Sequence, residues 1–164
     1  MLSLIAPILT VLLLVILVAV FVIDLKTQTI PDGWWMALAL LGVVRVSAGY
    51  AGFLGDPMPV TLPDSFFGAF AASIPLFALA SANGGFGGGD IKLMFGAGIF
   101  LGWQPVLLAL FIGTILAAVI GVFLLVLGKA TRKTKIAFGP YLAIGIAVSA
   151  CIGQPLISRM LALS

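Results

Sequence analysis

Long apolar runs without charge constrain the fold of this chain more than any other feature. The first run extends from Leu2 to Ile23 and contains no charged residue. Charged residues make up 8% of the 164 residues, whereas soluble proteins carry roughly 25%. Because so few charges cannot cover a water-facing surface, most of the surface must face lipid. The sequence therefore predicts an all-α, polytopic membrane protein that is embedded in a lipid bilayer.

Six apolar segments are predicted to cross the membrane, since a spanning helix needs about 20 apolar residues. They are expected at residues 2–23, 34–50, 65–83, 91–103, 105–127 and 138–157. The first is interpreted as a retained helix, because it lacks the positively charged start of a signal peptide. The fourth is short: about 13 residues reach only about 20 Å across a hydrocarbon core of about 30 Å. Residues 1–164 are expected to form a single transmembrane domain.

Basic residues in the connections predict how the helices are oriented, because lysine and arginine gather on the cytoplasmic side. The connections after the first, third and fifth helices contain most of them, and the other side has only Arg45 and Arg159. This pattern places the odd connections in the cytoplasm and both termini outside. The basic residues of the odd connections are Lys26, Lys92, Lys129, Arg132, Lys133 and Lys135.

The residue inventory limits the chemistry that is available. The chain has no histidine and one cysteine, which removes the commonest general base, the commonest metal ligand and any paired-cysteine site. We therefore expect no metal and no cofactor, and we expect no nucleic-acid partner. There is also no glutamate, so the acidic residues are Asp24, Asp32, Asp56, Asp64 and Asp90.

Asp24 and Asp90 each adjoin a predicted membrane helix. Asp24 ends the first helix and Asp90 precedes the short fourth helix, so the predicted orientation puts both on the cytoplasmic side and Asp90 at some depth. Ionisable groups at such positions usually face the bundle interior or a water-filled cavity, which makes them functional candidates. The alternatives are an interfacial charge at Asp24 and a helix N-cap at Asp90.

Glycines and a second acidic turn surround these candidates. Gly87, Gly88 and Gly89 directly precede Asp90. Glycine permits positive φ and the close approach of another backbone, which would admit an extended peptide beside the aspartate. A flexible hairpin is the alternative. Asp32, which follows Pro31, is a competing acid but is predicted mainly to cap the second helix.

Four motifs occur in order along the chain, namely Asp24 with residues 30–32 (IPD), residues 87–93 (GGGDIKL), 101–103 (LGW) and 137–143 (AFGPYLA). They resemble those of the type IV prepilin peptidases, which are bacterial inner-membrane aspartyl proteases of the GxGD class. The resemblance implies that Asp24 and Asp90 form the catalytic pair, and we expect Gly87, Gly88, Gly89 and Lys92 to bind substrate. The implied substrates are prepilins or pseudopilins, cut where a basic cytoplasmic leader meets a hydrophobic helix.

Members of that family with two activities carry an additional N-terminal segment associated with N-methylation. This chain begins directly at the first helix of the peptidase half, so we expect a short form without methyltransferase activity. Peptide hydrolysis by two carboxylates would use one ionised group to activate water and one protonated group to donate to the carbonyl.

Three other readings of the chain stay open. The two acids could serve as ion-relay carboxylates in a small transporter or channel subunit, because buried intramembrane carboxylates often have that role. The chain could also be a GxGD protease for another substrate, or an assembly factor without chemistry.

Overall fold

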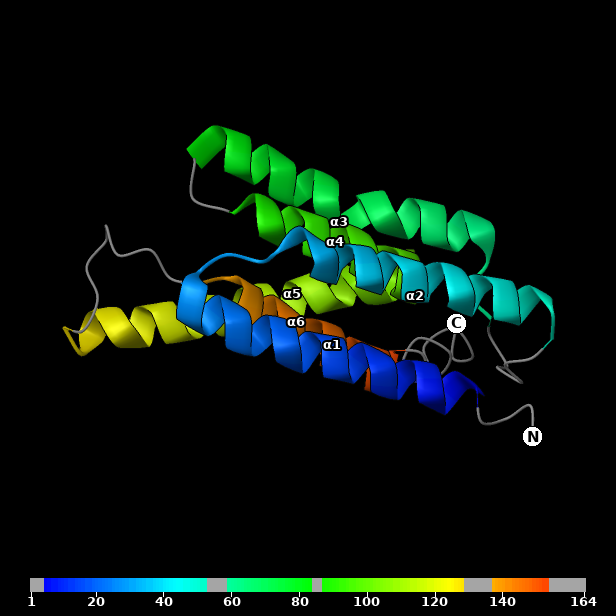
Figure 1. Ribbon diagram of the computed structural model, residues 1–164. Coiled ribbons are helices and arrows are strands. Elements are labelled where there is room, and N and C mark those ends of the chain that lie inside the picture. The colour runs from blue at the N-terminus through cyan, green and yellow to red at the C-terminus, as the bar shows by residue number, and fades with distance from the viewer. Residues whose placement is uncertain (1–4, 53–58, 84–86, 129–136, 154–164) are drawn as a thin grey trace.

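The computed structural model describes residues 5–52, 59–83, 87–128 and 137–153, and these residues form a bundle of helices (Figure 1). Each of the six segments predicted to be helical contains a helix, and, apart from the end of the last one, the observed ends differ from the expected ends by at most four residues. The helices are α1 (Ile5–Thr27), α2 (Asp32–Tyr50), α3 (Leu62–Asn83), α4 (Gly88–Leu101), α5 (Trp103–Val126) and α6 (Gly139–Val148), which continues into the π-helix η2 (Ser149–Gly153).

Four of the helices, namely α1, α2, α3 and α5, are long and apolar enough to cross a membrane. The predicted class, a polytopic helical membrane protein, is therefore confirmed. The fourth helix is short, as the sequence predicts: α4 has 14 residues, which corresponds to about 21 Å. The predicted end of the last helix at residue 157 lies outside the described residues.

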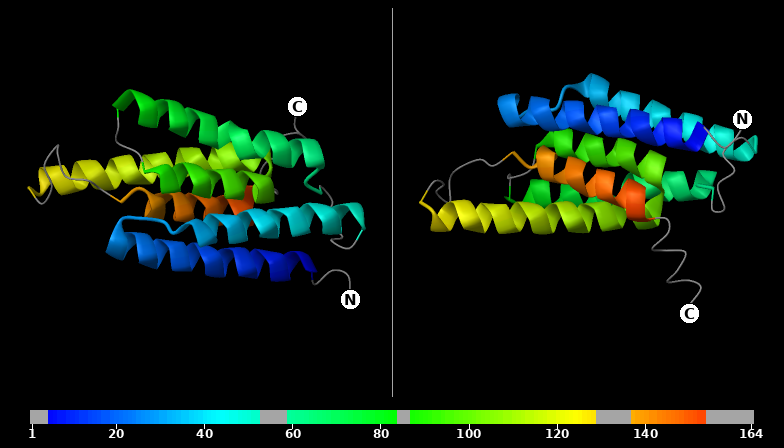
Figure 2. Two further views of the ribbon diagram at one scale, coloured as in Figure 1. Left: turned by 45° about the horizontal axis from the view of Figure 1, so that its top comes forward. Right: turned by 90° about the horizontal axis from the view of Figure 1, so that it is seen from below.

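The order of the helices places three connections at one end of the bundle. Helices α1, α3 and α5 end there, and α2, α4 and α6 begin there, as two further views show (Figure 2). Lys26 lies in the last turn of α1 and Lys92 lies near the start of α4, so both are at this end of the bundle. The other basic residues of the odd connections, together with Asp56 and Arg159, lie outside the described residues.

Helix α4 lies among the other helices and packs against α2, α3, α5 and α6. Its buried side chains include Leu93, Met94 and Phe100. Small residues allow its backbone to approach α3 closely, because a Cβ added to Gly98 would overlap the backbone of Gly68. Such contacts between small residues are a common way to pack helices in membranes. The position of α4 is therefore fixed by its neighbours along its length.

Polar side chains bind the far end of α4. The last carbonyls of a helix have no partner within the helix. Arg45 of α2 donates from Nη1 to the carbonyl of Phe100 at 2.9 Å, and its guanidinium lies 4.8 Å from the centre of the Phe100 ring. Ser65 of α3 donates from Oγ to the carbonyl of Ile99 at 2.8 Å. These bonds allow α4 to end inside the bundle.

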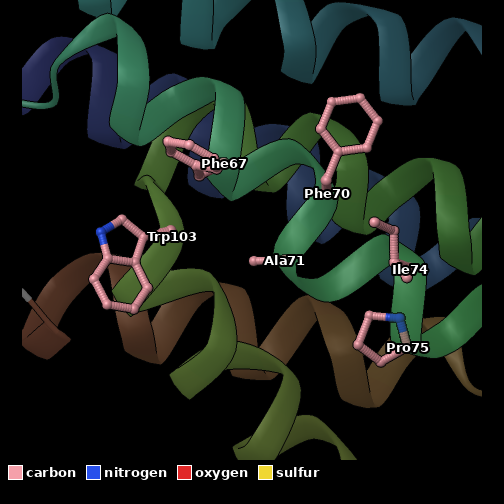
Figure 3. Close-up of a pocket in the computed structure, with 6 residues that line it drawn as sticks. All are labelled: Phe67, Phe70, Ala71, Ile74, Pro75 and Trp103. Carbon is pink, nitrogen blue, oxygen red and sulfur yellow. The ribbon is translucent and has the colours of Figure 1, made fainter.

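An apolar cavity of about 490 Å³ lies between α3 and the start of α5 (Figure 3). Phe67 and Ile74 expose 63% and 61% of their surface. The cavity therefore opens on the outer face of α3, and an apolar helix turns such a face toward lipid. It lies away from both candidate acids, since Trp103 follows the end of α4 that is opposite Asp90. The lining residues are Phe67, Phe70, Ala71, Ile74, Pro75 and Trp103.

Candidate active site

A cavity of about 260 Å³ at the end shared by the three connections brings Asp24 and Asp90 together. Asp24 comes from the last turn of α1 and Asp90 from the first turn of α4. Their exposed fractions are only 4% and 7%. The cavity thus unites two acids that lie far apart in the sequence. The remaining lining residues are Gln28, Thr29, Ile30, Asp32, Gly87, Gly88, Gly89 and Lys92.

Helical periodicity explains why Asp24 points inward. The buried residues of α1 include Leu13, Leu17, Val20 and Asp24, which recur at the spacing of one helix face. Asp24 therefore continues the apolar stripe that packs α1 against the bundle. The alternative of an exposed interfacial charge does not fit this burial. Its Oδ2 atom is buried and accepts no hydrogen bond from the residues that the structure describes.

Asp90 is held by the backbone that precedes α4. Gly87 is the N-cap residue of the helix and has an extended conformation, with φ −73° and ψ 141°. The amide of Asp90 donates to the Gly87 carbonyl at 3.1 Å, and the amide of Gly87 donates to Asp90 Oδ2 at 3.3 Å. Asp90 is thus the third residue of the helix and not its N-cap. It still uses one carboxylate oxygen to satisfy a free amide at the helix start.

The prediction that Asp32 caps α2 is wrong. The N-cap residue is Pro31, and no side chain makes a capping hydrogen bond there. The carboxylate of Asp32 instead accepts hydrogen bonds from Lys92 Nζ at 2.6 Å and from Trp35 Nε1 at 3.1 Å. Asp32 stands one position too late for capping, and Lys92 of α4 lies within its reach. The ion pair joins α2 to α4 at the edge of the cavity.

The three glycines line the cavity, and none of them has the positive φ that glycine permits. The described glycines with positive φ are Gly52, Gly102 and Gly128. The reason is that α4 already begins at Gly88, one turn earlier than the sequence suggests. Residues 84–86 lie outside the described residues.

Of these three glycines, only Gly89 lies close to the backbone of another segment. A Cβ on Gly89 would lie 3.0 Å from Ile30 Cβ and 3.4 Å from the Ile30 nitrogen, whereas a Cβ on Gly88 would meet no atom within 4 Å. Gly89 thus lets the segment that contains Pro31 pack against the start of α4. Gly87 and Gly88 are exposed.

Sequence reasoning missed Gly139, whose backbone lies against the Asp24 carboxylate. A Cβ built on Gly139 would lie 2.5 Å from Asp24 Oδ2. The motif at residues 137–143 was a signal for this region, but no residue of it was assigned to the site from sequence. Gln28 was also missed; its φ of 52° turns the chain away from α1 directly before the cavity-lining residues Thr29 and Ile30.

Comparisons with known proteins identify what the chain is similar to. The family model described as the type IV leader peptidase family matches residues 11–122. A prepilin leader peptidase/N-methyltransferase of Stutzerimonas stutzeri is 34% identical over 134 residues, which cover 78% of this chain and 44% of that protein. The protein of the same description from Legionella pneumophila is 30% identical over 143 residues, which cover 87% of this chain and 49% of that protein.

The corresponding protein of Pseudomonas aeruginosa is 34% identical over 134 residues and is covered to 43% of its length. The chain therefore spans less than half the length of these relatives. No solved structure matches the chain. The matched range of the family model includes Asp24, Asp32, Asp90 and Lys92, and it ends before α6.

Proposed function

Because the chain belongs to the type IV leader peptidase family, we propose that it is an aspartic endopeptidase that removes the leader from prepilins or pseudopilins. The observation that carries the proposal is the meeting of Asp24 and Asp90, two buried acids from distant parts of the sequence, in one cavity. The relatives are described as prepilin leader peptidases with an additional N-methyltransferase activity. The proposal for this chain concerns the peptidase step.

The mechanism follows from the chemistry of two neighbouring carboxyl groups. Two charges in one buried cavity are costly, so the pair favours a state that shares one proton. The ionised carboxylate takes a proton from water as the water oxygen attacks the peptide carbonyl carbon, and the protonated carboxyl donates to the carbonyl oxygen. The tetrahedral intermediate then loses the peptide nitrogen, which takes up a proton as the C–N bond breaks.

The cavity also supports the proposed mode of substrate binding. Gly87 and Gly88 are exposed and carry no side chains, so an extended peptide can run beside Asp90 without a steric barrier. Lys92 lies at the edge of the same cavity, where its ammonium group is bound by Asp32. We assign these glycines and Lys92 to the substrate-binding surface.

We place the site at the cytoplasmic face of a bacterial inner membrane, with both termini outside. The positive-inside pattern supports this orientation, and so does the position of Lys26 and Lys92 near the end of the bundle that holds the cavity. Cysteine labelling of intact cells with an impermeant thiol reagent tests it, after Cys151 is replaced by serine. Asp56→Cys should label and Lys133→Cys should not; the reverse pattern would refute the orientation.

Substitution of the two acids tests the catalytic assignment. Asp24→Asn and Asp90→Asn keep the shape of the side chain but cannot exchange the proton, so each should lower cleavage by about 100-fold or more. Asp64→Asn is the matched control, because Asp64 lies at the opposite end of the bundle, where it binds Thr61. The readout is the mass shift of tagged pilin precursors incubated with purified protein in detergent. If the Asp24→Asn variant is active and the Asp32→Asn variant is inactive, the assignment of Asp24 and Asp90 as the catalytic pair is wrong.

A further inference from the structure

The start of α6 makes a contact with Asp24 that the two-carboxylate mechanism does not require. Helix α6 begins at Gly139, directly after Phe138, and has ten residues. Its first residue lies against the carboxylate of Asp24, which comes from the opposite end of the chain. This position is beyond the residues matched by the family model. The contact therefore needs an explanation of its own.

The first turn of α6 places the amino end of a helix beside Asp24. Pro140 has no N–H, and the amide of Tyr141 donates to the carbonyl of Phe138 at 3.1 Å. The backbone of Gly139 lies directly against the Asp24 carboxylate. The amino end of a helix also carries partial positive charge, which favours a negative group placed beside it. The amino end of α6 thus favours a carboxylate at this place.

The absence of a side chain at Gly139 has a steric reason. Gly139 is not among the described glycines with positive φ, so its backbone conformation would accept any residue. Its surroundings would not: a Cβ would lie 2.5 Å from Asp24 Oδ2, 3.0 Å from Asp24 Cγ and 3.1 Å from Ile30 Cδ1. A methyl group would therefore occupy the space that the Asp24 carboxylate fills.

We propose that Gly139 is a positioning residue, which fixes the place of the Asp24 carboxylate in the cavity by leaving room for it beside the amino end of α6. The role in catalysis rests on the proposed peptidase function, whereas the contact itself does not. Because the atoms that would clash belong to the end of a side chain, Gly139→Ala should displace the carboxylate and leave the helices in place.

A second glycine of α6 supplies the matched control. A Cβ on Gly145 would overlap the backbone carbonyl of Ala109 in α5. Backbone cannot swing aside as a carboxylate can, so Gly145→Ala should force α5 and α6 apart. Gly145 lines no part of the cavity that holds the two acids. Gly145→Ala thus tests the packing of α6, and Gly139→Ala in the same helix tests the positioning of the Asp24 carboxylate.

The first measurement is steady-state cleavage of a pilin precursor together with thermal unfolding in detergent. Gly139→Ala should lower kcat by about 10- to 100-fold, since a misplacement of about 1 Å has that effect, and it should leave KM unchanged. Gly145→Ala should lower the unfolding temperature and retain kcat per folded molecule. Equal kcat in Gly139→Ala and wild type would overturn the proposal, and so would a loss of activity explained entirely by unfolding.

The second measurement is a double-mutant cycle that needs no activity. Gly139→Ala should lower the unfolding temperature less in an Asp24→Ala background than in wild type, because the clashing carboxylate is gone. Gly145→Ala should have the same effect in both backgrounds. An effect of Gly139→Ala that is independent of Asp24 would overturn the proposed contact. A wild-type protein that cleaves no pilin precursor would overturn the proposed function, and the cycle would still decide the contact.

Discussion

Valine substitutions at Gly88 and Gly89 separate two roles of the glycines beside Asp90. The two positions are adjacent in the same helical turn, yet their surroundings differ. A Cβ on Gly89 would lie 3.0 Å from Ile30 Cβ, whereas a Cβ on Gly88 would meet open space. Valine adds two methyl groups beyond Cβ, so only Gly89→Val forces Ile30 to move. Ile30 directly precedes Pro31 and lines the cavity, so its displacement changes the geometry around both acids.

The size of the effect follows from this contact. Carbon atoms pack best at about 3.5–4.0 Å, and the forced insertion of methyl groups into a packed site costs about 1–3 kcal/mol. If this cost falls on the arrangement of Asp90 relative to Asp24, cleavage by Gly89→Val slows roughly 5- to 150-fold in kcat. Gly88→Val meets no protein atom, so its unfolding temperature and kcat should match wild type. Its valine would instead obstruct the peptide and raise KM.

Initial rates of pilin-precursor cleavage over a range of substrate concentrations check both expectations, with thermal unfolding measured on the same samples. A lowered kcat for Gly89→Val with a raised KM for Gly88→Val would support the two roles. Equal and near-normal rates for both variants would refute the reasoning, because residues 87–89 would then only connect α3 to α4.

Two further substitutions test the polar contacts of α2. Asp32→Asn removes the ion pair with Lys92 and should change cleavage and unfolding temperature little, because solvent screens an exposed pair; a loss of activity as large as that of Asp90→Asn would show that the pair is required. Arg45→Met leaves the carbonyl of Phe100 without its guanidinium donor and should destabilise the fold by about 1–3 kcal/mol. Thermal unfolding in detergent measures this, and an unchanged unfolding temperature would contradict the role of Arg45 at the end of α4.

The membrane helices could be predicted from sequence because each depends on its own composition. The apolar run of α1 and the short run of α4 are local properties that no distant residue alters. The resemblance carried by the motifs at residues 24–32 and 87–93 also implied that the two acids form a pair. Every residue assigned to the site from sequence lines the cavity.

The errors concern partners that lie far away in the chain. Asp32 has the local pattern of an N-cap, but it binds Lys92, 60 residues later. The glycines before Asp90 were interpreted as permitting positive φ or the close approach of another backbone. Only the second holds, because α4 includes Gly88 and Gly89 and the need for glycine at position 89 comes from Ile30. The contact of Gly139 with Asp24 joins the two ends of the chain. These contacts depend on how the helices pack, which local sequence patterns do not contain.

The way in which α4 ends has a consequence for evolution. Arg45 and Ser65 bind the carbonyls at its far end, and Asp90 lies near its beginning. With the far end of α4 fixed, the number of residues between that end and Asp90 sets how far Asp90 lies along the bundle, at 1.5 Å per residue. One inserted residue would also rotate Asp90 by about 100° around the helix, away from Asp24. Insertions and deletions should therefore be tolerated in the connections between helices and eliminated within α4.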